Sequence, residues 1–166
     1  MNNISKIIDC ITERMSNFLI IAVLLMIALI FFSIIFRFLF NINSIAIQEL
    51  VMYLHAFVFL FGLSYAIKKN THVKIDIIYS KLSKRYKTLV SIIGLFFFII
   101  PTSVFIIYIS LDMVGQSWLI LEGSSEANGL DLVFVLKSFI PLMGLLIFLQ
   151  SISEIIKYVE IYINEC

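Results

Sequence analysis

The sequence is poor in charge, proline and cysteine, and each shortage disfavours a class of protein. Charged residues make up 14% of the chain and hydrophobic residues 61%, whereas soluble domains carry roughly a quarter charged and about half apolar residues. Composition therefore argues against a soluble enzyme, a disordered protein or a nucleic-acid-binding protein. Cys10 and Cys166 stand near opposite ends of the chain, so they form neither a metal-ligand spacing nor a disulfide framework.

Sequence motifs for chemistry are also missing. No nucleophile motif, phosphate-binding loop or glycine-rich dinucleotide loop occurs, so we expect a chain that is not an enzyme and holds no cofactor or metal. The two histidines, His55 and His72, would lie about 25 Å apart along a helix. They cannot ligate one haem within a chain, because axial ligands must converge on a single iron.

What the sequence has in abundance is long apolar runs. A helix needs about 20 apolar residues to cross a hydrocarbon core of ~30 Å, and four blocks of that length are present, at 15–36, 50–67, 88–111 and 132–153. They lack the alternation of a membrane β-barrel. The sequence therefore predicts an all-α integral membrane fold, with residues 1–166 forming a single domain of four transmembrane helices. The third apolar stretch continues to Leu121, so we expect strong tilt or a bend at Pro101.

Basic residues are concentrated in the segment 68–87, between the second and third blocks. Asp76 is the only acid there. Basic loops stay in the cytoplasm, which places both termini in the cytoplasm too. Amphipathic stripes at 4–15, 75–86 and 152–159 predict helices in the membrane interface. Candidate contacts to lipid headgroups are Lys68, Lys69, Lys81, Lys84, Arg85 and Lys87.

The middles of the four blocks contain no ionisable residues. Intramembrane charges usually mark the path of an ion or substrate, and none is evident at the block centres. We therefore expect a scaffold, an anchor or an accessory subunit that has no transport activity alone. Gly94 and Gly144 are expected on helix faces that pack against a larger partner.

Charged and aromatic residues gather instead at the outer ends of the blocks. Arg37 and Glu49 bracket the short segment 41–48. Two readings are open for this pair: an ion pair that contributes little, or a docking point for an extracytoplasmic partner, since rim charges set register and association rate. The predicted periplasmic partner contacts are Arg37, Glu49, Trp118, Glu122, Glu126 and Asp131.

An ordered set of short motifs resembles the DctQ-like family, the small membrane subunits of tripartite ATP-independent periplasmic (TRAP) transporters. The set includes Arg37 at the end of the first apolar block and Lys137 near the start of the fourth. Two positions depart from the family pattern: Ile45-Ala46-Ile47 replaces a frequent tryptophan, and Asp131 replaces a frequent proline. The matching positions are Glu49 in Gln-Glu-Leu, His72 and Asp76 in His-Val-Lys-Ile-Asp, Pro141 after isoleucine, and Gln150 after leucine.

The resemblance implies a role in secondary transport across the bacterial inner membrane. It implies a large multi-span partner that carries the substrate and sodium, and a periplasmic binding protein that delivers an organic acid, of the C4-dicarboxylate or sialic acid class. Sodium would then bind the partner and not this chain, which would contact membrane lipids and no nucleic acid. Two alternatives stay open: a haem-bearing or structural membrane anchor of an electron-transfer complex, and a stand-alone small transporter.

Overall fold

The structure, a computed structural model, describes residues 3–41, 43–69 and 83–164, and their regular secondary structure is entirely helical. The predicted positions His72, Asp76 and Lys81 lie outside the described residues. The amphipathic segments 4–15 and 152–159 are continuous with the first and last helices. The elements are α1 (Asn3–Phe40), α2 (Ile45–Lys68), α4 (Lys84–Gly94), the π-helix η1 (Leu95–Ile99), α5 (Ile100–Leu119) and α6 (Val133–Asn164).

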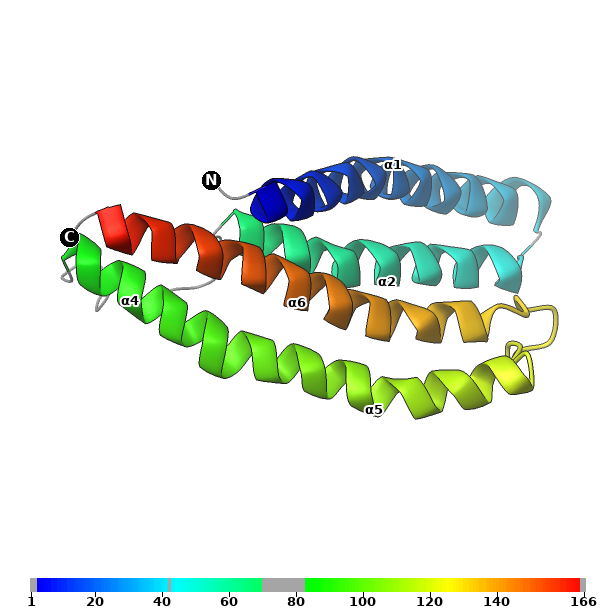
Figure 1. Ribbon diagram of the computed structural model, residues 1–166. Helices are drawn as coiled ribbons and strands as arrows, with labels where there is room; N and C mark the ends of the chain where they lie inside the picture. Colours follow the sequence, from blue (N-terminus) through cyan, green and yellow to red (C-terminus); the bar gives the residue numbers. More distant parts are fainter. Residues whose placement is uncertain (1–2, 42, 70–82, 165–166) are drawn as a thin grey trace.

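The helices lie side by side, with α6 in the middle (Figure 1). α6 contacts α1, α2 and the whole α4–η1–α5 rod, while α1 contacts α2 and α6. We call the end with the α1–α2 and α5–α6 connections the hairpin end, and the opposite end, with both termini, the terminal end. α2 and α6 both start at the hairpin end and therefore run parallel.

The third apolar stretch forms one long rod that changes its helical pitch just before Pro101. The amide of Ile100 donates to the carbonyl of Leu95, five residues back. Proline has no N–H and its ring collides with the carbonyl four residues earlier, so a wider π-turn before it relieves both problems. The expected bend near Pro101 therefore takes the form of a π-helix followed by α5.

Small residues set the spacing between α5 and α6. Ser103, Ser110 and Ser117 recur every seven residues and are almost completely buried. On α6, a Cβ atom at Gly144 would lie 2.8 Å from Cγ1 of Ile107 and 3.2 Å from the carbonyl oxygen of Ser103. Gly144 is thus used inside the chain and does not face a partner, contrary to our expectation, whereas a Cβ at Gly94 would meet nothing within 4 Å. Close backbone approach through small residues is how helices pack in lipid.

Most large apolar side chains point outward. Phe31, Phe97, Phe105 and Leu119 are each at least 60% exposed, which would be unstable in water but suits lipid. Four helices are long and apolar enough to cross a membrane, Ile4–Phe40, Ile45–Lys68, Arg85–Leu119 and Val133–Ile163. The all-helical, four-span fold predicted from the sequence is confirmed.

Candidate functional site

Glu49, in the first turns of α2, fastens the α5–α6 connection to that helix. Its carboxylate accepts hydrogen bonds from the hydroxyl of Ser124 and from the backbone amide of Leu130, the latter at 2.6 Å. Gly129 lies beside this contact, and a Cβ there would collide with Ser124 and stand 2.9 Å from Oε1 of Glu49. Ser44 caps the start of α2 by accepting the amide of Ile47 at 3.4 Å. The predicted docking residue Glu49 therefore holds the loop in place.

The end of α5 is tied to the start of α6 by a second pair of contacts. Lys137 forms an ion pair with Glu122, which also accepts a hydrogen bond of 2.6 Å from the hydroxyl of Ser117. The Lys137 ammonium, followed by this hydroxyl, holds the pKa of Glu122 below its ordinary value of 4.5. Trp118 donates its indole N–H to Ser138 at 2.8 Å. Both predicted contact residues, Trp118 and Glu122, thus have structural partners in the chain.

The turn after α5 is a Schellman motif with an unusual residue in it. The amide of Glu122 donates to Ser117 O at 3.0 Å and the amide of Leu121 to Trp118 O at 3.3 Å, the two bonds of that motif. Leu121 occupies the left-handed region with φ of 47°, where glycine is the usual residue. This turn directs Glu122 back toward Lys137.

The remaining predicted contacts are exposed. Arg37, Glu126 and Asp131 all point to solvent at the hairpin end, and no ion pair joins Arg37 to Glu49 within the described residues, because Glu49 is engaged by the loop. The structure thus separates the six predicted residues into two groups. Glu49, Trp118 and Glu122 build a fixed platform, and Arg37, Glu126 and Asp131 are charges available on it.

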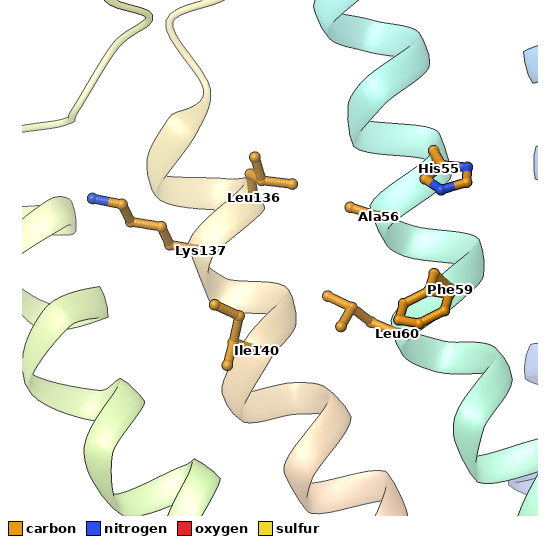
Figure 2. A pocket seen from close by; sticks show the side chains of 7 residues that line it. All are labelled: His55, Ala56, Phe59, Leu60, Leu136, Lys137 and Ile140. Carbon is orange, nitrogen blue, oxygen red and sulfur yellow. The ribbon is translucent and has the colours of Figure 1, made fainter.

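An apolar groove of about 470 Å³ lies between α2 and α6 near this platform (Figure 2). Lys137 lines it but turns its amine away toward α5, where it meets Glu122. His55 contributes an exposed imidazole. With no acid or second histidine in its lining, the groove offers a surface for an acyl chain or an apolar side chain. Its lining residues are His55, Ala56, Phe59, Leu60, Leu136, Lys137 and Ile140.

A buried polar network closes the terminal end, centred on the family-like residue Gln150. Gln150 is fully buried; its oxygen accepts from the hydroxyl of Thr12 at 2.6 Å, and its amide donates to Asp9 at 3.1 Å and to Glu154 at 3.2 Å. Lys157 pairs with both acids at 2.6 Å. Sequence reasoning missed this network, although a polar i, i+4, i+7 row in an apolar helix (150, 154, 157) is a visible signal.

The predicted headgroup contacts are arranged in different ways. Lys68 has a side chain only 12% exposed; it donates to Asp9 O at 2.8 Å and pairs with Glu13 at 3.2 Å, so it binds α1. Lys69 lies over the ring of Tyr65 at 5.5 Å. Arg85 lies over the ring of Tyr162 at 4.9 Å. Lys87 is partly exposed near the start of α4, and Lys81 and the side chain of Lys84 are outside the described part.

Three buried serines between the two polar ends bond within their own helices. Ser64 donates to Phe61 O at 2.9 Å, Ser103 to Ile100 O at 2.7 Å and Ser110 to Ile107 O at 3.0 Å. In residues 3–41, 43–69 and 83–164 there is no cluster of three or more metal-binding side chains. Pro141 sits inside α6, where its missing N–H leaves the Lys137 carbonyl without its helical donor.

The chain matches the model of a known family. The family model described as "Tripartite ATP-independent periplasmic transporters, DctQ component" matches residues 26–160, which is most of the chain. The matched range includes Glu49, Pro141 and Gln150, and it includes the hairpin end described above. No curated protein matches the sequence.

Proposed function

This chain is a member of the DctQ family of TRAP transporters, and we propose that it acts as a static scaffold beside the large membrane subunit and helps a periplasmic binding protein to dock. Membership makes the chain a small transporter subunit rather than an enzyme. With four spanning helices it is a multi-pass protein of the bacterial inner membrane. The family works as a tripartite system with a large M subunit and a periplasmic binding protein.

The observation that carries the scaffold role is the contrast between the interior and the two ends of the bundle. The interior serines Ser64, Ser103 and Ser110 bond within their own helices. Both ends are fastened across helices, by Glu49 and Lys137 at one end and by Gln150 at the other. A chain built in this way holds its helices in one arrangement. It provides a fixed frame against which a moving subunit works, and no pathway of its own.

The docking role is supported by the exposed charges on the platform. Arg37, Glu126 and Asp131 are exposed beside a loop that Glu49 fixes in position. Such charges steer a transient partner and set its orientation without slowing its release. Acids outnumber the base, so the facing surface of the binding protein is expected to be basic.

The cargo proposed for the complex is an organic acid of the C4-dicarboxylate or sialic acid class, imported with sodium that binds the large subunit. The orientation proposed is the one given by the basic residues, with the hairpin end in the periplasm and both termini in the cytoplasm. Nothing in the structure favours the alternative role of a haem-bearing or structural electron-transfer anchor over transport.

The function is tested by reconstitution into liposomes. The chain alone should give no sodium-driven uptake of either acid, whereas the chain with its large subunit and binding protein should give saturable uptake. Saturable uptake by the isolated chain would reject the scaffold role.

The orientation is tested by cysteine labelling of intact spheroplasts with a membrane-impermeant reagent. A cysteine placed at Ser125 should react with the reagent, and a cysteine placed at Lys81 should not. The reverse pattern would reject the orientation.

Docking is tested by charge reversal that leaves the platform intact. Arg37→Glu, or Glu126→Lys with Asp131→Lys, should slow uptake without reducing recovery of the large subunit. The defect should depend on salt, because exposed charges are screened beyond about 8 Å at physiological ionic strength. Lys6→Glu, an exposed reversal at the terminal end, is the matched control. Unchanged uptake in all reversals would place docking on the large subunit alone.

A further inference from the structure

Asp112 is a carboxylate that belongs to neither polar end. It lies on α5 and its side chain is exposed. No hydrogen bond or ion pair engages it within the part of the chain that the structure describes. The third apolar block, 88–111, ends directly before Asp112. The depth of Asp112 is given by the packing of α5 on α6.

The register between α5 and α6 gives its depth. Trp118 is hydrogen-bonded to Ser138, and Gly144 packs against Ser103 and Ile107. Asp112 lies between these two contacts, so its level along α6 falls between Ser138 and Gly144. That level is farther from the hairpin end than Lys137.

The contacts between α6 and α2 relate this level to a position along α2. Phe139 of α6 contacts the rings of Phe57 and Phe61, with centroids 5.7 and 5.6 Å apart, so the level of Asp112 corresponds to residues near 60 of α2. Along α2 that position is about 17 Å from Glu49 and about 12 Å from Lys68. With these two residues taken as the borders of the hydrocarbon layer, the carboxylate lies well inside the layer.

The residues around Asp112 form a stripe that faces away from α6. It lies opposite the buried serines of α5, and its members follow one another at helical spacings of four and three. Tyr108 is 77% exposed and presents its hydroxyl on this face. A Cβ atom at Gly115 would meet nothing within 4 Å, so another helix backbone could approach closely there. The stripe, which we call the α5 outer face, consists of Phe105, Tyr108, Asp112, Gly115 and Leu119.

An unpaired carboxylate surrounded by acyl chains is costly, and such residues usually face a protein partner of opposite charge. From this charge requirement we infer that the α5 outer face is the surface on which the large membrane subunit packs, through a helix that carries a lysine or arginine opposite Asp112. Tyr108 adds a hydrogen-bonding group one turn away, and Gly115 allows close contact. This inference rests on the proposed function, since it assigns the face used by that partner.

The inference is tested in the complete complex, purified through a tag on this chain. Replacing Asp112 by Asn should lower the amount of co-purified large subunit about threefold, and Asp112→Lys by at least tenfold, as expected when a buried partner charge is left without its counterpart. Neither change should lower the melting temperature of the isolated chain, because no hydrogen bond or ion pair engages Asp112 within the described residues. Recovery equal to wild type for both variants would overturn the inference.

Photocrosslinking identifies the occupant of the face. A photoreactive residue at Tyr108 or Gly115 should yield an adduct with the large subunit, whose crosslinked peptide contains or adjoins a basic residue. The control is Leu24 of α1, which is 63% exposed and should give no more adduct than background. Adducts only with lipid, or with a second copy of this chain, would overturn the inference. If the wild-type chain recovers no large subunit at all, the proposed function itself fails, which is a different result.

Discussion

Gly144 provides a direct test of how α5 and α6 are held together. Replacing it by alanine would place a methyl group 2.8 Å from Cγ1 of Ile107, where carbon atoms prefer about 3.5–4.0 Å, and 3.2 Å from Ser103 O. Ile107 can change its rotamer, but the Ser103 oxygen belongs to the backbone of α5. The helices must therefore separate locally.

The expected magnitude follows from two opposing effects. Overpacking a tight contact costs about 1–3 kcal/mol, and alanine recovers about 1 kcal/mol of helix preference relative to glycine. The net loss for Gly144→Ala is about 1 kcal/mol, or a melting temperature about 2–4 °C lower for a chain of this size. Gly144→Leu has no room at all and should lower it further.

Gly94 supplies the matched control, because it is also a helical glycine but a Cβ there meets nothing within 4 Å. Gly94→Ala should raise the melting temperature by about 2–4 °C through helix preference alone. Unfolding is followed by the fluorescence of Trp118, the only tryptophan, which packs edge-on against Phe134 of α6 at 4.7 Å. A Gly144→Ala variant as stable as Gly94→Ala would show that the close contact of α5 and α6 is not under steric constraint.

Three further outcomes are expected. Leu121→Gly should raise the melting temperature by about 2–4 °C, since it relieves about 1 kcal/mol of left-handed strain; a drop would mean that the leucine side chain outweighs its backbone cost. Lys157→Met should destabilise the isolated chain by about 3 kcal/mol, because Asp9 keeps an uncompensated charge, and adding Asp9→Asn should restore part of the loss; a purely additive double variant would contradict the pairing. The Glu122 pKa is depressed by Lys137, so this carboxylate stabilises the fold fully above about pH 4.5 and loses its effect as the pH falls through its lower folded value. Melting curves of wild type and Glu122→Gln should therefore differ at pH 7 and converge below that range.

The sequence was sufficient for the number of helices and for the class of protein, because both depend on local composition. A run of about 20 apolar residues is long enough to span a membrane whatever surrounds it, and the excess of Lys and Arg between Ile67 and Thr88 gives an orientation by the same local logic. Proline also acts locally, so a bend near Pro101 could be predicted. Its form as a π-turn depended on the backbone of the preceding residues.

The hydrogen-bond partners of the polar residues could not be predicted from the sequence. The sequence left two readings for Glu49, an ion pair with Arg37 12 residues before it or a docking point, yet Glu49 binds Ser124 and Leu130, which are more than 70 positions away. Gln150 was recognised only as a motif position, and its contacts with Thr12 and Asp9 join opposite ends of the chain. Such pairings depend on which helices become neighbours, and sequence spacing carries no information on that.

The positions of residues along the helices were likewise determined partly by composition and partly by helix packing. Composition determined that four helices cross and that few charges lie near their centres, because the transfer of each residue into lipid is a local cost. Only the packing of α5 on α6 decided that Gly144 lies inside the chain and that Asp112 lies at a level between Ser138 and Gly144 of α6. Counting residues along the rod α4–η1–α5 does not give its position against α6, and only contacts such as that of Trp118 with Ser138 set the register.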